Sequence, residues 1–136
     1  MPLDMLDHYS IRTTKLEETK EFYEIVLGLT VGDRPDLGFP GYWLYVGNQP
    51  VVHLIGINED DPQELVDYLG DADTDTLVGG GAVDHLAFRA SDAPALKKQL
   101  DDKKVEYRER NIPELKLFQL FLEDPNEVTV ELNYYR

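Results

Sequence analysis

Polar and apolar residues alternate along two short segments of the chain that resemble each other. Within Leu6–Thr13, Tyr9 and Ile11 fall on one face, and Asp84–Ala90 has the same alternation around Leu86 and Phe88. A period of two is typical of a β-strand that packs one of its faces. Each segment therefore predicts a strand with a buried side and a polar side.

A helical pattern follows each predicted strand. In the first half, Thr14 and Glu17 are spaced as a capping box, apolar residues follow at helical spacing, and Gly28 ends the pattern. In the second half, Ser91 or Asp92 can cap a helix whose residues Leu96 and Leu100 face the core. We expect one helix in each half.

Three more strands are expected after each helix, with turns marked by Gly47-Asn48-Gln49-Pro50 and Asp124-Pro125-Asn126-Glu127. The expected strands are residues 29–33, 42–46 and 51–57 in the first half, and 106–110, 117–122 and 129–133 in the second. Each half therefore has the order βαβββ, which predicts an α+β fold built from two such modules.

The two halves also repeat their polar residues. Asp7-His8 in the first half corresponds to Asp84-His85 in the second, and His8 is followed by His53 at a spacing of 45 residues. In the second half His85 is followed by Glu131 at a spacing of 46 residues. We expect a single domain, residues 1–136, with modules at 1–57 and 83–136 and an acidic junction loop at 58–82 that ends in glycines.

Composition narrows the possible functions. The chain has 136 residues and a formal net charge of -14, so it would repel a nucleic-acid backbone, and it has no basic amphipathic stretch for a membrane. It contains no cysteine, which excludes disulfides, thiolate nucleophiles and thiolate metal ligands. No signal-peptide pattern and no membrane-spanning run is present, so we expect a cytoplasmic protein with a small-molecule partner.

The repeat-equivalent polar residues predict a metal site. By strand parity His8, His53, His85 and Glu131 all point away from the helix-packed face, and they meet if the modules associate about a pseudo-twofold axis. Two histidines and one carboxylate with open positions are typical of non-haem Fe(II) oxygenases, and zinc, nickel, manganese and cobalt fit the same ligands, so the residues themselves do not choose the metal.

Other residues on the same faces are candidates for substrate binding. Arg12 and Arg89 can hold an anionic group or pair with nearby acids. Trp43 and Phe121 lie on strands expected to line a cavity and would supply apolar walls. Tyr134 can donate a proton near Glu131, or it can pack at the end of the chain.

Three segments resemble the vicinal oxygen chelate superfamily, which includes glyoxalase I, extradiol dioxygenases and bleomycin-binding proteins. They are Phe22–Leu29, which matches the family's F-Y-x-x-x-L-G-[LM] pattern, the strand that begins Asp84-His85, and Phe121–Leu132, which matches F-x-D-P-x-G-x-x-x-E-L. The resemblance covers nearly the whole chain, with Glu127 where the family usually has glycine. It implies that two paired βαβββ modules form a cup-like mixed sheet, with the helices on the outside and a metal inside.

The resemblance also implies roles for the polar residues. His8, His85 and Glu131 match the family's metal ligands. His53 stands where glyoxalase I usually has a carboxylate or amide ligand, and we interpret it as an acid–base group, with a fourth ligand as the alternative. This pattern resembles that of extradiol dioxygenases, so we expect a dioxygenase of that type acting on a small catechol-like substrate, with Fe(II) as the favoured metal. The alternatives are a glyoxalase I-like lyase or isomerase and a metal-free antibiotic-binding protein, and a homodimer is expected because relatives commonly pair modules between chains.

Overall fold

The computed structural model describes residues 5–57, 79–81 and 83–136. The chain divides into two units, Met1–Leu77 and Val78–Arg136, and each is described by itself. The predicted modules 1–57 and 83–136 lie in one unit each. The predicted junction loop, 58–82, lies outside the described residues except for 79–81.

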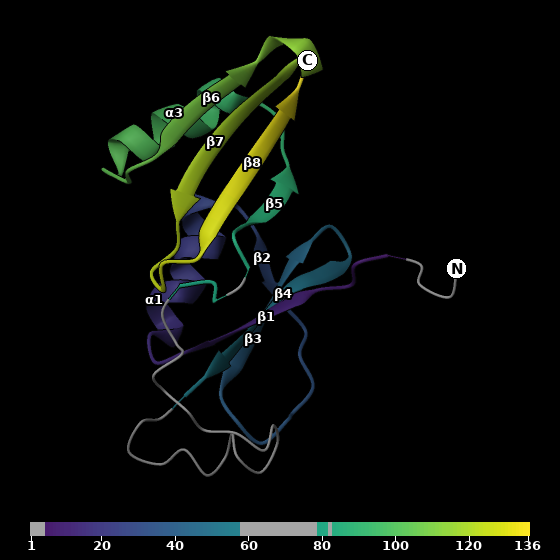
Figure 1. Cartoon of the computed structure of the whole chain (residues 1–136). Coiled ribbons are helices and arrows are strands. Elements are labelled where there is room, and N and C mark those ends of the chain that lie inside the picture. The colour runs from purple at the N-terminus through teal and green to yellow at the C-terminus, as the bar shows by residue number, and fades with distance from the viewer. Residues whose placement is uncertain (1–4, 58–78, 82) are drawn as a thin grey trace. The chain divides into compact units, whose positions relative to one another are not determined.

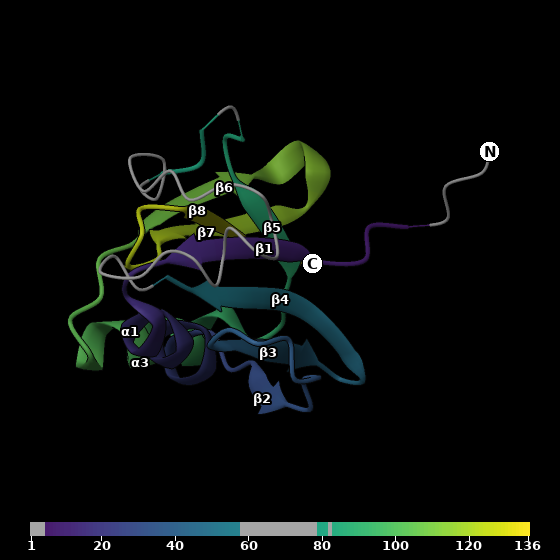
Figure 2. The ribbon, with the colours of Figure 1, turned by 90° about the horizontal axis from the view of Figure 1, so that it is seen from below.

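The first unit is a four-stranded sheet with one helical segment (Figure 2). Its elements are β1 (Tyr9–Thr13), α1 (Leu16–Glu21), a π-helical turn η1 (Phe22–Val26), β2 (Thr30–Gly32), β3 (Gly41–Val46) and β4 (Gln49–Gly56). The strands lie in the order β1-β4-β3-β2, with β1 parallel to β4 and the other pairs antiparallel. The order along the chain is therefore βαβββ, as predicted.

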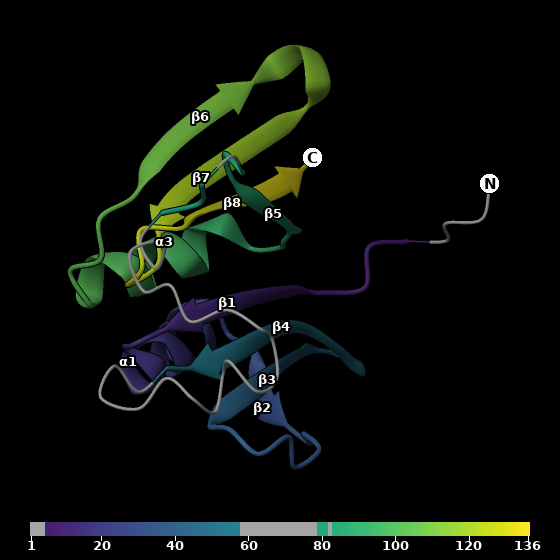
Figure 3. The same ribbon diagram turned by 60° about the horizontal axis from the view of Figure 1, so that its bottom comes forward.

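The second unit repeats this arrangement (Figures 1 and 3). Its elements are β5 (Leu86–Arg89), α3 (Ala93–Asp102), β6 (Arg108–Ile112), a 3-10 turn η2 (Pro113–Leu115), β7 (Leu117–Glu123) and β8 (Thr129–Tyr135). The strand order β5-β8-β7-β6 matches that of the first unit, and β5 is parallel to β8. The two βαβββ modules and the α+β class are confirmed.

Strand parity decides which side chains enter each core. In the first unit α1 contacts β3 and β4, and Leu44, Val52 and Leu54 are almost fully buried. In the second unit Leu120 and Val130 are fully buried. Burying such side chains contributes about 1.5–3 kcal/mol each. The residues between them in sequence point to the other face of each sheet, where the candidate site residues lie.

Two of the three predicted helix ends are confirmed. Gly28 adopts a positive φ of 80° after the first helix, and Asp92 caps α3 by accepting a hydrogen bond from the Ala95 amide at 3.2 Å. The Thr14–Glu17 capping box is wrong. The cap position is Lys15, whose amide donates to the Thr13 hydroxyl at 2.8 Å instead.

Two local features of the second unit differ from expectation. Strand β6 lies two residues later than the predicted 106–110, because its residues are mostly exposed and carry no hydrophobic alternation to mark the register. Glu127 occupies a left-handed turn position with φ of 63°, where the Asp124 carboxylate accepts hydrogen bonds from the Asn126 and Val128 amides. The turn thus forms without glycine. Among the described residues no helix is long and apolar enough to cross a membrane.

Candidate functional site

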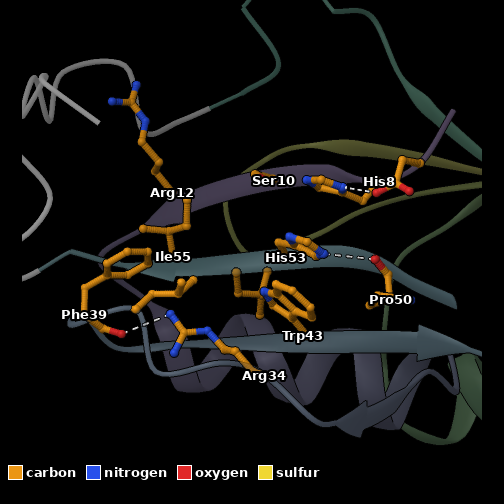
Figure 4. Close-up of a pocket in the computed structure, with 12 residues that line it drawn as sticks. His8, Ser10, Arg12, Arg34, Phe39, Trp43, Pro50, His53 and Ile55 are labelled. Carbon is orange, nitrogen blue, oxygen red and sulfur yellow. Dashed lines mark hydrogen bonds and ion pairs between the residues drawn. The ribbon is translucent and has the colours of Figure 1, made fainter. Parts of the chain in front are cut away.

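Three aromatic rings form a stack on the non-helical face of the first sheet (Figure 4). Trp43 on β3 lies directly opposite His53 on β4, and their ring centroids are 4.1 Å apart. His8, just before β1, stacks on the other side of His53 with a centroid distance of 3.7 Å. The structure thus brings together three residues that the sequence predicted as site residues, and the His53 ring lies between the other two rings.

The hydrogen bonding of His53 defines which of its nitrogens can act. Nε2 lies 3.0 Å from the carbonyl oxygen of Pro50, and a carbonyl only accepts, so Nε2 carries a proton and Nδ1 holds the lone pair when the ring is neutral. Burial lowers the pKa of His53 below its ordinary value, and the neighbouring His8 lowers it further, whereas the bond to Pro50 opposes the shift. His53 is therefore a neutral base at pH 7.

A cavity of about 630 Å³ opens beside this stack within the first unit. Arg12 and Arg34 line it together with Phe39 and the stacked rings, as Figure 4 shows. The Arg34 guanidinium donates to the Phe39 carbonyl oxygen at 3.0 Å and lies over the Phe39 ring. The only acid among the lining residues is Asp7, so this cavity is locally cationic within a strongly acidic chain.

The two repeat-equivalent histidines each bond to the aspartate that precedes them. His8 Nδ1 lies 2.6 Å from an Asp7 carboxylate oxygen, and His85 Nδ1 lies 2.8 Å from an Asp84 carboxylate oxygen. The bond to Asp84 raises the pKa of His85. In each pair Nδ1 donates, which leaves the lone pair of the neutral ring on Nε2. Metal-binding histidines usually donate their other N–H to a carboxylate or carbonyl in this way.

In the second unit the Glu131 carboxylate lies beside His85. One of its carboxylate oxygens, Oε1, lies 3.6 Å from His85 Nε2. That separation is shorter than two metal–ligand bonds of about 2.1 Å each, so both atoms can bind one ion. The other oxygen, Oε2, accepts a hydrogen bond from the Asn133 side chain at 3.0 Å.

The remaining nominated residues of the second unit divide between the two faces of its sheet. Phe121 lies opposite Glu131 in the register, on the same face. Arg89 also lies on this face, with its guanidinium 4.7 Å from the centre of the Tyr135 ring. Tyr134 lies on the other face, buried beside Phe118. The structure therefore does not bring Tyr134 to Glu131, and we leave it out of the site.

Four residues that contribute contacts around the candidate site were missed by sequence reasoning. Arg34 lies in a loop without periodic pattern, so nothing in the sequence marked it. Asn133 lies two residues after Glu131 on the same face of a strand, a spacing that could have nominated it. Asp7 and Asp84 were visible in the repeat, but their bonds to the histidines were not predicted.

The donor set suits a divalent ion of borderline character. Two imidazole Nε2 atoms oriented by carboxylates and one carboxylate oxygen are typical ligands for zinc, nickel or iron. Within neither unit, as far as the described residues go, do three histidine or acidic side chains gather to hold an ion.

Comparisons with known proteins agree with this class of fold. The model of the Glyoxalase/Bleomycin resistance protein/Dioxygenase superfamily matches residues 5–132. The chain therefore belongs to that superfamily, the vicinal oxygen chelate group.

Individual relatives cover almost the whole chain. "Glyoxylase I 4" of Arabidopsis thaliana is 27% identical over 96% of this chain and 70% of its own length. The solved structure of lactoylglutathione lyase from Agrobacterium tumefaciens is 19% identical, with a TM-score of 0.67 over 98% of this chain and 96% of that one. An antibiotic binding protein from a Streptomyces species is 18% identical, with a TM-score of 0.66 over 100% and 99%. Both structures share the fold.

Proposed function

We propose that this protein is a divalent-metal-dependent enzyme that moves protons on a small substrate bound through two neighbouring oxygens. The observation that carries the proposal is the pair of Asp–His units, each of which leaves Nε2 as the free nitrogen, together with Glu131 at 3.6 Å from His85 Nε2. We assign His8, His85 and Glu131 as the ligands of one ion. The modules that supply them come from one chain or from two chains of a homodimer.

His53 supplies the acid–base function in this proposal. Its Nε2–H is bonded to the Pro50 carbonyl, so the proton is taken up and returned at Nδ1. Because burial lowers its pKa, the ring is neutral near pH 7 and can accept a proton. The same bond removes Nε2 from the atoms that could bind a metal, which favours a base over a fourth ligand.

A bound divalent ion would supply Lewis acidity at the substrate oxygens. The residues around the stack do the rest. Trp43 and Phe39 provide apolar walls that exclude water from the reacting atoms, and Arg34 offers a guanidinium fixed by the Phe39 carbonyl. A substrate with a small planar body and an anionic or strongly polar end fits these surroundings.

The relatives favour a glyoxalase-like lyase or isomerase as the reaction. Two of them carry the names of such enzymes, and a neutral base beside the proposed ion is what proton transfer between adjacent carbons needs. The test is isomerisation of 2-oxoaldehyde–thiol adducts by protein loaded with nickel or zinc, without oxygen. His53→Gln should lose about 10²–10⁴-fold in kcat, the usual range for general acid–base groups, and retain metal binding.

An extradiol-type dioxygenase is the second candidate. Two histidines and one carboxylate resemble the ligand set of non-haem Fe(II) oxygenases, and a neutral histidine beside them can accept a catechol proton. Oxygen uptake with a panel of catechols after anaerobic loading with Fe(II) would support it. If neither panel reacts and the protein binds none of these metals, the metal-free binding protein replaces both.

We also propose that the protein is a cytoplasmic homodimer. A chain without cysteine is compatible with that location. Sedimentation of the purified protein tests the dimer. A mixture of His8→Ala and Glu131→Ala chains, each inactive alone, tests where the modules pair. Recovery of activity on mixing would show that one site draws on both chains.

A further inference from the structure

A line of hydrogen-bonded side chains runs across the second sheet and ends on Glu131. Gln119 on β7 lies directly opposite Asn133 on β8, and Glu131 lies two residues along β8 on the same face. Gln119 Nε2 donates to Asn133 Oδ1 at 2.9 Å, and Asn133 Nδ2 donates to Glu131 Oε2 at 3.0 Å. Three polar side chains from two strands thus form one chain of hydrogen bonds.

The carboxylate at the end of this chain sets the direction of every bond in it. Ionised Glu131 can only accept, so Asn133 must turn its NH₂ group toward it. The Asn133 oxygen then faces Gln119, which must in turn offer its own NH₂ group. Reversing either amide would set two acceptors or two donors against each other. The order of donors and acceptors is therefore determined by the chemistry of Glu131.

This direction leaves one atom of Gln119 without a partner. Gln119 is only 6% exposed, and its Oε1 is buried with no hydrogen-bond partner among the described residues. A buried unpaired acceptor is destabilising, so an apolar residue of similar size would be expected here if packing alone mattered. Among the described residues, the side-chain NH₂ group of Gln119 makes one hydrogen bond, to Asn133.

The bond to Asn133 also fixes which oxygen of Glu131 remains available. Oε2 is engaged by the amide, whereas Oε1 lies 3.6 Å from His85 Nε2. The glutamate side chain is 12% exposed, so little water competes for the same orientation. Without Asn133, the carboxylate would be free to rotate about its last torsion and present either oxygen.

We infer that Gln119 and Asn133 are positioning residues that hold Glu131 with one oxygen directed at the ion-binding nitrogen of His85. Gln119 acts only through Asn133, and neither binds the ion. The inference rests on the proposed function, since it concerns the orientation of one of the proposed metal ligands. Outer partners of this kind commonly change metal affinity by 10- to 100-fold.

The experiment is a double-mutant cycle on the full-length, metal-free protein, with nickel affinity measured by calorimetry. Gln119→Met keeps the shape of the side chain and removes the donor, and Asn133→Leu removes the bond to Glu131. We expect each to weaken nickel binding about tenfold. In the Asn133→Leu background, Gln119→Met should have no further effect.

Two controls separate positioning from a loss of folding. Asn111→Leu removes an amide from β6 on the other face of the sheet, opposite Phe118, and should leave nickel affinity unchanged. Hydrogen exchange of the Asn133 side-chain amide, followed by NMR without metal, should be slow in the wild type and faster in Gln119→Met. Thermal unfolding of each variant confirms that the fold persists.

The outcomes distinguish this inference from the proposed function. Two results would overturn the Gln119–Asn133–Glu131 relay, the series of hydrogen bonds that orients the carboxylate, while leaving the metal site intact. One is a nickel affinity of Gln119→Met equal to that of the wild type. The other is a double variant in which the losses of the two single variants simply add. If the wild type binds no nickel, zinc or Fe(II), both the metal site and the relay are refuted. A normal metal site with fast exchange of the Asn133 amide in the wild type also refutes the relay.

Discussion

Removing the aspartate that bonds to His85 should weaken metal binding without disturbing the fold. An Asp84 carboxylate oxygen lies 2.8 Å from His85 Nδ1, and this bond orients the ring so that Nε2 is the proposed ligand atom. Losing such a partner usually costs 10- to 100-fold in metal affinity, or about 1.4–2.7 kcal/mol. Because the Asp84 side chain is 96% exposed, solvent screens its charge, and we expect Asp84→Ala to show about the tenfold end of that range.

Two further variants separate the charge of Asp84 from its hydrogen bond. Asp84→Asn keeps a hydrogen-bond acceptor and loses the charge, so its nickel affinity should fall between those of the wild type and Asp84→Ala. Asp102→Asn, which removes an exposed charge at the end of α3, should behave as the wild type. Calorimetry with nickel gives the affinities.

An independent readout needs no metal. The bond to Asp84 raises the pKa of His85. In an NMR titration of the three histidines, the midpoint of the His85 titration should therefore lie at lower pH in Asp84→Ala than in the wild type. Unchanged nickel affinity together with an unchanged His85 titration in Asp84→Ala would refute the idea that this carboxylate orients the ligand.

The other predictions concern stability and pH. Folding lowers the pKa of His53. The contribution of His53 to the free energy of unfolding should therefore be complete above about pH 6.5 and be lost as the pH falls through the lowered pKa. Urea unfolding of the wild type and His53→Gln from pH 7.5 to 5 measures this loss. Gly41→Ala should cost more than about 2 kcal/mol, because its Cβ would overlap the Leu54 carbonyl oxygen. Gly47→Ala, at φ of 59° with nothing near, should cost only about 1–2 kcal/mol. Glu127→Gly should stabilise by about 0.5–1 kcal/mol in thermal unfolding, since it relieves a φ of 63°, and a lower melting temperature would contradict the strain argument.

The sequence alone determined the architecture and the face on which each candidate residue lies. Alternation of period two is a local property of the chain, so it correctly placed His53 and Trp43 on the face opposite Leu54. The repeated Asp–His pairs and the glycine after the first helix were legible for the same reason. The start of β6 was not, because an exposed edge strand carries no hydrophobic alternation.

Only the tertiary structure decided how the polar atoms are connected. Strand parity already separates Tyr134 from Glu131, because an odd spacing of three residues places them on opposite faces of β8, but parity does not say which atoms bond to one another. The bond from His53 to the Pro50 carbonyl and the Gln119–Asn133–Glu131 chain depend on strand register and on directional hydrogen bonds. Those contacts form between residues brought together by folding, and no local pattern in the sequence encodes which nitrogen or oxygen is left free.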